Sequence, residues 1–294
     1  MKRSRTHAVP GLLRRLNVRR VLETVQSVGP CTRADLTRLT RISAPTMSKL
    51  VAALVREGLL ERDPKPVTTR GRPGVLFRLA RRRGCVHGVV IDVREVTIVA
   101  ATLDGALDAG RTLTLPTPRS FDALLDLVCG EIRAMVAAEK SPCRGLGLTI
   151  PGLIDRRTGR VTFSPNLHFL DGRNPGLSMA ERLGLEVVAV QEEHALCLAA
   201  QRFGAAKGLS DFALIDVSAG FGMGVYSGGR FIEGSRGYAG EIGHVMVRPE
   251  GLPCGCGNRG CLETIATDRA LVDAVSAREG RALTIDEIID QVRA

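Results

Sequence analysis

One short segment near the C-terminus restricts the fold of this 294-residue chain more than any other feature. It carries His244, Cys254, Cys256 and Cys261, with the cysteines in the run Cys-Gly-Cys-Gly-Asn-Arg-Gly-Cys. One imidazole and three thiolates make a complete tetrahedral ligand set for zinc, and the glycines let the loop wrap tightly. Because side chains take all four positions, we expect a structural zinc site rather than a catalytic one. The alternative is a group of reduced cysteines that are adjacent without a metal.

Positive charge is concentrated in the first 83 residues. They hold 20 Lys or Arg and 5 Asp or Glu, a net charge of +15, whereas the remaining residues hold 21 and 26, a net charge of −5. This asymmetry is typical of a nucleic-acid-binding module joined to a globular domain, although a solvated basic surface is the alternative. Aromatic residues make up only 3% of the chain, which disfavours stacking on single strands. Double-stranded DNA is therefore the expected partner.

The arginine-rich stretch 81–84 separates two predicted domains, residues 1–83 and residues 84–294. No apolar run approaches the roughly 18 residues that a membrane helix needs, so we expect a cytoplasmic protein with no membrane partner. The other cysteines are expected to be small core residues. They are Cys31, Cys85, Cys129, Cys143 and Cys197.

Apolar spacing in the basic region predicts three helices. The first spans residues 18–28 and ends at a Gly-Pro pair. The second begins after the N-cap Thr32, has Asp35 in its first turn, buries Leu36 and Leu39, and stops near Arg41. This arrangement favours a packing helix followed by the first helix of a helix-turn-helix.

The third helix is the expected recognition helix. Ser43 is its predicted N-cap, Pro45 lies in its first turn and Gly58 closes it. Strands at 59–62 and 75–79, joined by a Gly/Pro loop with arginines, predict a wing suited to a narrow minor groove. A small structural bundle is the alternative. The expected DNA contacts are Ser43, Ala44, Thr46, Ser48, Lys49, Arg70 and Arg72.

The second half reads as an α/β domain. Strands are predicted at 89–91, 98–100, 146–150, 187–190 and 212–217, with helices at 121–139, 179–183 and 195–203. Alternating strands and helices favour an α/β fold. The run Gly220-Phe-Gly-Met-Gly224 is consistent either with a phosphate-binding loop or with a tight hairpin.

Two carboxylates bracket the cysteine loop. Glu241 precedes the histidine by three residues, and Glu263 follows the last cysteine by two. Paired carboxylates accept hydrogen bonds from several hydroxyl groups, which is what sugar recognition requires. The pair therefore indicates a sugar site beside the metal.

These motifs together resemble the ROK family (repressors, open reading frames and kinases), and in particular its sugar-responsive, xylose-type repressors. The resemblance covers nearly the whole chain. It is carried by Arg70-Gly-Arg-Pro73, Pro151-Gly152, Pro165-Asn-Leu167, Gly237-Tyr-Ala-Gly-Glu-Ile-Gly-His244 and Cys254-Gly-Cys-Gly-Asn-Arg-Gly-Cys-Leu-Glu263.

The resemblance implies a winged helix-turn-helix followed by an actin-like, two-lobed α/β domain of the sugar-kinase type. It implies zinc at the four residues above and a sugar pocket in the cleft. Members usually continue well beyond the point corresponding to Ala294, so the second lobe is expected to be short, as a natural truncation or a fragment. The implied effector residues are Asn166, Glu193, Glu241, His244 and Glu263.

The first phosphate loop departs from the family's kinases. They carry Asp-x-Gly-Gly-Thr where this chain has Asp92-Val93 followed by Arg94-Glu95-Val96. The side chains of Arg94 and Glu95 are expected to fill space that glycines leave for a triphosphate, and the valine lacks the threonine hydroxyl.

The catalytic pair departs as well. The kinases' Asn-Asp pair corresponds to Glu192-Glu193, so the residue at the base position, Glu193, is a longer carboxylate. We therefore expect no catalytic residues and no enzyme activity. The resulting hypothesis is a repressor of carbohydrate-metabolism genes that binds operator DNA as a homodimer or higher oligomer and responds to a small sugar. The alternatives are a sugar kinase with an added DNA-binding domain and a DNA-binding protein that senses nothing.

Overall fold

The computed structural model describes residues 10–64, 74–218 and 220–293. Two of the expected DNA contacts, Arg70 and Arg72, lie outside the described residues. Contacts divide the chain into two compact units. The first contains residues 1–87, 99–112 and 134–145, and the second contains residues 88–98, 113–133 and 146–294.

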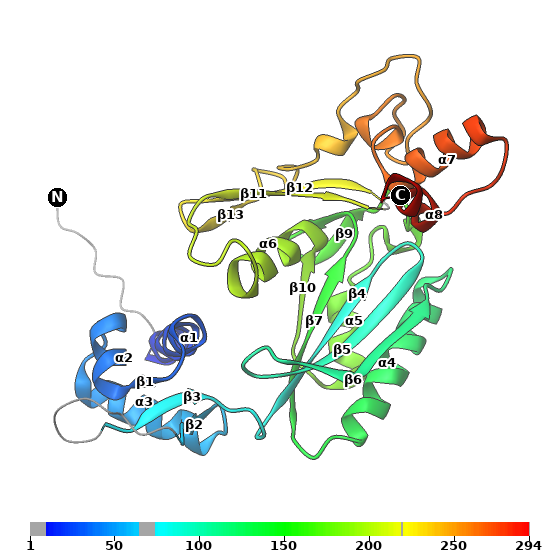
Figure 1. Ribbon diagram of the computed structural model, residues 1–294. Coiled ribbons are helices and arrows are strands. Elements are labelled where there is room, and N and C mark those ends of the chain that lie inside the picture. Colours follow the sequence, from blue (N-terminus) through cyan, green and yellow to red (C-terminus); the bar gives the residue numbers. More distant parts are fainter. Residues whose placement is uncertain (1–9, 65–73, 219, 294) are drawn as a thin grey trace. The chain divides into compact units, whose positions relative to one another are not determined.

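The basic N-terminal region forms helices and a small antiparallel sheet (Figure 1). Its elements are α1 (Pro10–Val28), β1 (Cys31–Thr32), α2 (Arg33–Thr40), α3 (Ala44–Arg56), β2 (Leu60–Arg62) and β3 (Leu76–Leu79). The strand order is β1-β3-β2, and both pairings are antiparallel. Helices α2 and α3 with the β2–β3 pair are the helix-turn-helix and wing strands that the sequence predicts.

A complete capping box starts α2. The Thr32 hydroxyl accepts the backbone N–H of Asp35 at 3.1 Å, and the Asp35 carboxylate accepts the backbone N–H of Thr32 at 3.2 Å. The helix ends at Arg41, whose φ of 58° lies in the left-handed region. Both predicted ends of this helix are confirmed.

One apolar core holds the region together. It is formed by side chains of all three helices, all three strands and the turn before α3. The buried members are Val21, Val25, Cys31, Leu36, Ile42, Met47, Leu50, Val51, Leu54, Leu60, Phe77 and Leu79. Helix α3 therefore buries one apolar stripe, formed by Met47, Leu50, Val51 and Leu54, with Val55 partly buried beside it.

Two details of the sequence prediction are wrong. Helix α1 begins at Pro10 rather than Val18, because its first turns expose Leu12 and Leu13 and so carry no amphipathic signal. Leu39 is 44% exposed, since Leu36 and Thr40, one turn apart, occupy the buried face of α2.

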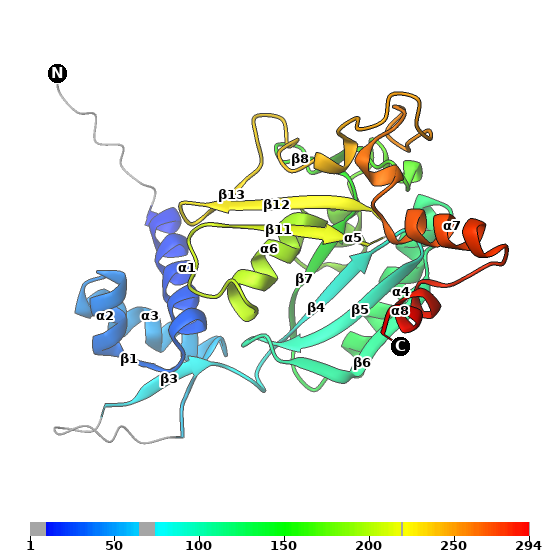
Figure 2. The ribbon, with the colours of Figure 1, turned by 45° about the horizontal axis from the view of Figure 1, so that its top comes forward.

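Residues 85–203 form a five-stranded sheet with helices on both faces, and the strands of this sheet contain residues of both units. Helices α4 and α5 lie on one face and α6 on the other (Figures 1 and 2). Strand β10 runs parallel to β7. In spatial order the strands are β10 (Val187–Gln191), β7 (Cys143–Ile150), β4 (Cys85–Ile91), β5 (Glu95–Thr102) and β6 (Leu107–Pro116); the helices are α4 (Phe121–Ala137), α5 (Pro175–Leu183) and α6 (Glu192–Phe203).

An antiparallel sheet packs on the other side of α6, which contacts two of its strands (Figure 2). Its strands follow in chain order, β11 (Phe212–Val217), β12 (Phe221–Ser227) and β13 (Arg230–Ile232). The remaining elements are the hairpin β8 (Leu153–Asp155) and β9 (Arg160–Phe163), the short 3-10 helices η1 (His168–Leu170), η2 (Ile242–His244) and η3 (Leu262–Thr264), and helices α7 (Asp268–Glu279) and α8 (Ile285–Arg293).

All strands and helices predicted for this half are confirmed within a few residues, whereas strands β6, β8, β9, β12 and β13 and helices α7 and α8 were not anticipated. Strand β6 exposes at least every second side chain, so it has no apolar run. The glycine run forms part of β12, in the hairpin with β11. A Cβ on Gly224 would lie 2.3 Å from Cys197 Sγ, so α6 can pack this closely on β12 only because this residue is glycine.

No helix in the described parts of the chain combines the length and apolarity needed to cross a bilayer.

Candidate effector cavity, metal centre and DNA-binding face

The N-terminal end of α3 presents a small polar surface. Ser43, Ala44, Thr46, Ser48 and Lys49 are all exposed, as a DNA-reading face requires. Ser43 precedes the helix as predicted, but its hydroxyl donates to Thr46 Oγ1 at 2.9 Å and caps no backbone N–H. Proline at the second helical position removes one of the N–H groups that such a cap uses.

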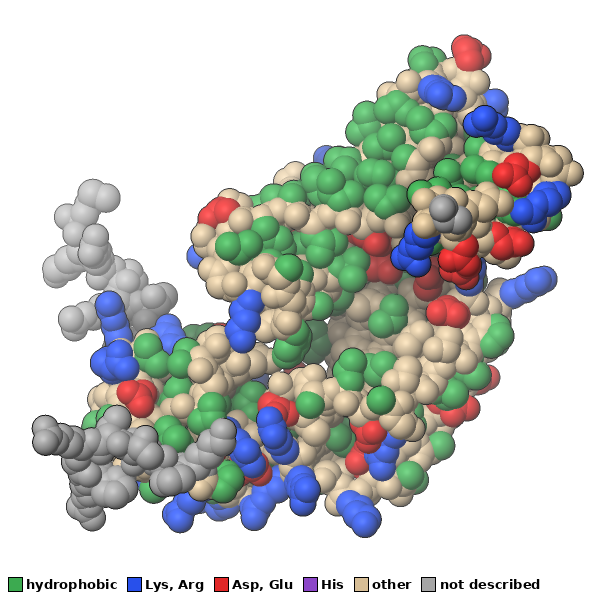
Figure 3. Space-filling view, in the orientation of Figure 1, with side chains coloured by type: hydrophobic (Ala, Val, Ile, Leu, Met, Phe, Trp, Pro, Cys, Tyr) green, Lys and Arg blue, Asp and Glu red, His purple; other side chains and the backbone are tan. Residues whose placement is uncertain are grey.

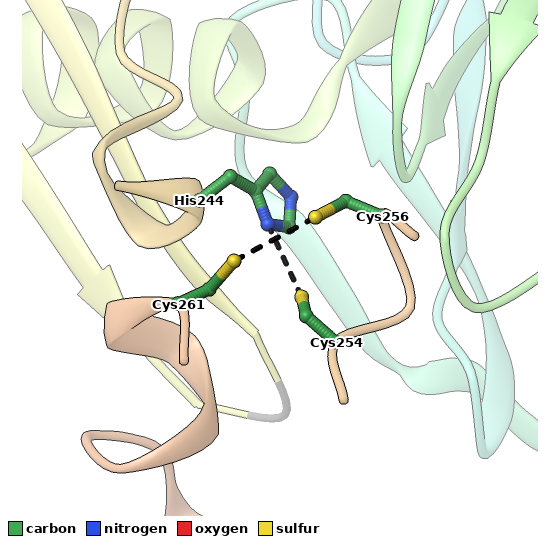
Figure 4. A group of neighbouring side chains, drawn as sticks. All are labelled: His244, Cys254, Cys256 and Cys261. Carbon is green, nitrogen blue, oxygen red and sulfur yellow. Dashed lines mark hydrogen bonds between the residues drawn. The ribbon is translucent and has the colours of Figure 1, made fainter. Parts of the chain in front are cut away.

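The four predicted metal ligands converge (Figure 4). Their ligand atoms all lie within 4.8 Å of one another. Cys256 Sγ and Cys261 Sγ are 3.7 Å apart, and Cys254 Sγ lies 3.5 Å from His244 Nδ1. A tetrahedral zinc ion with bonds of about 2.3 Å to sulfur and about 2.0 Å to nitrogen separates such atoms by about 3.5–3.8 Å. The spacing and the donor set therefore fit zinc, which would hold the loop closed.

Glycine is required where the cysteine loop turns back. Gly260 has a φ of +66°, and a Cβ there would lie 1.5 Å from the carbonyl oxygen of Arg248. The backbone of the adjacent Cys261 pairs with that of Met246 in an isolated antiparallel β-bridge, which brings the two sides of the loop together. The sequence expectation of a tightly wrapped loop is met by this contact.

A cavity of about 480 Å³ lies in the second unit, next to the cysteine loop. It brings together all five residues that the resemblance implied for an effector, Asn166, Glu193, Glu241, His244 and Glu263. Glu193 comes from the first turn of α6, and the others come from loops and 3-10 helices after β9 and β13. Figure 3 shows acidic side chains within the hollow below β11 and β12.

His244 joins the metal centre to the cavity. Its Nδ1 faces Cys254, whereas its Nε2 lies 3.8 Å from a carboxylate oxygen of Glu241. Glu263 also faces both sides, because one of its oxygens accepts the Cys254 thiol at 3.8 Å and the other accepts the Phe221 backbone N–H at 3.4 Å. The cysteine loop therefore sets the positions of two cavity side chains.

Six carboxylates line the cavity, and among the described lining residues none is Lys or Arg. They are Asp92, Glu192, Glu193, Asp216, Glu241 and Glu263. Burial, reinforced by Glu193, Asp92 and Asp216, raises the pKa of Glu192 to about 7. Burial with Glu193 and Glu263 raises the pKa of Glu241 to about 7, and burial also raises the pKa of Glu193. The cavity is therefore acidic but partly protonated near neutral pH.

Three of these acidic residues, Asp92, Glu192 and Asp216, were not among the effector residues expected from the sequence. Asp92 directly follows β4, and Asp216 is the penultimate residue of β11. Polar residues at the carboxyl ends of strands mark ligand sites in α/β folds, so the position of Asp92 and Asp216 at the ends of apolar runs was the available signal.

The loop after β4 contributes only its first residues to the cavity. Asp92 and Val93 line it, whereas Arg94 and Glu95 are exposed and do not belong to the described lining. Val96 is fully buried. The backbone N–H of Asp92 donates to the Glu95 carbonyl at 2.9 Å, which closes a tight turn after β4.

Comparison with known proteins agrees with this arrangement. A model described as "ROK family" matches residues 87–294, and one described as "MarR family" matches residues 11–71. The chain is 28% identical over 283 residues to the xylose repressor of Bacillus subtilis, which covers 95% of this chain and 72% of that protein.

Solved structures that are similar to this chain include two ROK family proteins. A ROK family transcriptional regulator described as a homologue of the E. coli MLC protein matches with a TM-score of 0.75 and 27% identity over 90% of this chain and 68% of that chain. A ROK family glucokinase from Streptomyces griseus, in complex with glucose and AMPPNP, matches with a TM-score of 0.61 and 29% identity over 67% of this chain and 62% of that chain.

Proposed function

The chain belongs to the ROK family, and from this premise we propose that it is a DNA-binding transcriptional regulator, a repressor of carbohydrate-metabolism genes that responds to a sugar. One observation carries the proposal: the same chain holds a helix-turn-helix with an uncovered polar face and a cavity that collects the five expected sugar contacts. The similarity to a xylose repressor and to a ROK transcriptional regulator supports it.

Residues 1–83 form the DNA-binding part in this proposal. The face of α3 enters the major groove of double-stranded operator DNA, with Lys49 near base edges or phosphates, and Arg70 and Arg72 of the wing loop approach the minor groove. Helix-turn-helix dimers read paired half-sites, so the protein acts as a homodimer or higher oligomer. Light scattering during gel filtration tests that assembly.

Residues 84–294 form the effector-sensing part. Asn166, Glu241 and Glu263 bind sugar hydroxyl groups, and His244 faces the sugar through Nε2 while Nδ1 binds structural zinc. The sugar alters DNA affinity only if it binds with different affinity to the DNA-binding conformation and to a conformation that does not bind DNA.

The sugar-kinase alternative is favoured by one observation, the similarity to a glucokinase, and Glu193 retains a carboxylate in the cavity. Against it stand the loop Arg94-Glu95-Val96, which lacks the kinase glycines and threonine, and the six cavity carboxylates, whose charge disfavours a triphosphate. We infer that the protein is not an enzyme. A coupled assay that detects ATP consumption with any hexose would overturn this inference.

The proposal is tested by DNA binding at fixed salt concentration. Fluorescence anisotropy with the DNA upstream of the protein's own gene is measured alone and with pentoses, hexoses and amino sugars. We expect specific binding whose affinity changes about tenfold with one sugar, a coupling of about 1.4 kcal/mol. Glu241→Gln is expected to abolish the response, and the exposed Glu250→Gln serves as the matched control. Specific binding that no sugar alters would instead identify a constitutive DNA-binding protein.

A further inference from the structure

A second group of metal-ligating side chains lies outside the effector cavity. Cys85 and His87 are on β4, and Cys143 begins the adjacent strand β7. One ligand atom from each of the three lies within 4.8 Å of the others, and His87 Nδ1 is 3.3 Å from Cys143 Sγ. Cys85 and His87 are two residues apart on a strand, so their side chains leave the same face of the sheet.

Burial makes this group unusual. His87 is 2% exposed, and its Nε2 has no hydrogen-bond partner among the described residues. A buried polar nitrogen without a partner costs free energy, and the sulfur near Nδ1 is only a weak partner. The reading of isolated cysteines as small core residues suits the buried Cys31, Cys129 and Cys197, but it gives no reason for an imidazole between two thiols.

The separation of the donor atoms matches a bound ion. A tetrahedral zinc ion separates an imidazole nitrogen and a thiolate by about 3.5 Å, close to the distance between His87 and Cys143. Two thiolates and one imidazole select soft or borderline cations such as Zn²⁺ and Cu⁺ over Mg²⁺ or Ca²⁺. We propose that Cys85, His87 and Cys143 form a second metal site, for a thiophilic cation, separate from the cysteine loop.

A buried carboxylate acts on this group, although it does not belong to the set of ligand atoms within 4.8 Å of one another. Glu139, just beyond α4, has a largely buried side chain that pairs with Arg111. It also acts electrostatically on both Cys85 and His87. Because Cys85 begins β4 directly after the stretch 81–84, a bound ion fixes the start of this strand to β7.

The test counts metal ions on the full-length protein. Protein reduced and loaded with excess Zn²⁺, then desalted, is measured by native mass spectrometry and elemental analysis. We expect two zinc ions per chain in the wild type, one in Cys143→Ser and one in Cys256→Ser, which disrupts the cysteine loop. Cys31→Ser, which removes a buried thiol outside both groups, is the matched control and should keep two.

Two further measurements keep the result decisive. A parallel sample loaded with Cu⁺ under reducing conditions shows which cation the site retains against a chelator, and circular dichroism checks the fold of each variant. If Cys143→Ser fails to fold, the wild-type count still decides, together with His87→Gln. One ion in the wild type, a second ion that survives Cys143→Ser and His87→Gln, or a disulfide between Cys85 and Cys143 in place of the ion would each overturn the proposal. None of these outcomes depends on DNA or sugar binding.

Discussion

The pKa of Glu192 reflects the burial and the negative charge of the cavity. It occupies the first turn of α6, and its carboxylate is disfavoured first by burial and then by Glu193, Asp92 and Asp216. These neighbours are all acidic, so each added negative charge in the cavity favours the protonated form. The residue is therefore a source of pH-dependent stability.

Replacing Glu192 by Gln should remove part of that dependence. The pKa of Glu192 is about 7 in the folded protein and near 4.5 in an unfolded chain, so the folded state binds more protons between these values. Folding stability contributed by this group is therefore present below about pH 4.5 and is lost as the pH rises toward 7. At pH 8 we expect Glu192→Gln to raise Tm by about 2 °C or more, because about 1 kcal/mol shifts Tm by roughly 2–4 °C in a chain of this size.

Thermal unfolding followed at pH 5 and pH 8 checks this prediction. The gain should shrink at pH 5, where the carboxyl is already protonated. The exposed Glu250→Gln is the control and should change neither value. An equal change in Tm for Glu192→Gln at both pH values would contradict the raised pKa of Glu192.

Lys49 carries a prediction for the DNA-binding face. It is exposed near the N-terminal end of α3, so Lys49→Ala should weaken DNA binding. If it contacts only phosphate, the loss should be similar for all sequences and the slope of log K against log salt should become shallower by about 0.9. Salt titrations with specific and random duplexes measure both quantities. Lys207→Ala, an exposed lysine of the second unit, is the control, and a loss confined to the specific duplex would place Lys49 on a base.

At the scale of elements, the contact between α6 and β12 positions one wall of the cavity. The helix carries Glu192 and Glu193, and it approaches the strand at two glycines. A Cβ on Gly222 would lie 2.5 Å from Glu193 Oε1, and one on Gly224 would lie 2.9 Å from the Glu193 carbonyl oxygen. The glycines therefore set the depth at which the helix presents its carboxylates.

Gly224→Ala should destabilise the protein by about 1–3 kcal/mol, the usual cost of forcing extra atoms into a packed contact. The matched change is Gly130→Ala within α4, where an added Cβ meets no atom within 4 Å. An exposed alanine in a helix interior is more favourable than glycine by about 0.5–1 kcal/mol, so this variant should be more stable. Urea unfolding shows whether each variant has a lower or a higher free energy of unfolding than the wild type. Equal destabilisation of both variants would refute the close approach of α6 to β12.

At the scale of the whole molecule, the four candidate metal ligands and the cavity share residues. His244 and Glu263 contact cysteines of the loop and also line the cavity. Helix α3, by contrast, packs in a separate apolar core formed by the N-terminal helices and strands. Loss of the metal at the loop is therefore expected to affect the effector site before it affects the helix-turn-helix.

Cys256→Ser, or treatment with a chelator, should weaken sugar binding at least tenfold, about 1.4 kcal/mol, because Glu241 and Glu263 lose their fixed positions. Isothermal titration with the responsive sugar measures this change, and DNA affinity without sugar serves as the internal control. Added Zn²⁺ should restore the chelated wild type but not the variant. Normal sugar binding by metal-free protein would show that the loop has no role in the cavity.

The sequence by itself determined the features that lie within a short window of residues. Thr32 and Asp35 determine the start of α2, the apolar stripe from Met47 to Leu54 determines the buried face of α3, and the spacing of the cysteines determines the metal loop. Such features depend on helix periodicity, capping and side-chain chemistry, which act over a few residues. Edge strands such as β6, with no continuous apolar run, gave no comparable signal.

Only the tertiary structure decided which distant residues meet. Asp92 and Asp216 join Glu241 because two different strands end at the same cavity, and Cys143 meets His87 because β7 lies beside β4 in the order β10-β7-β4-β5-β6. Strand order is fixed by long-range pairing and packing, and no local pattern encodes it. For the same physical reason, the sequence indicated the expected effector residues one by one, whereas the acidic character of the whole cavity and the second group of cysteines emerged only from the fold.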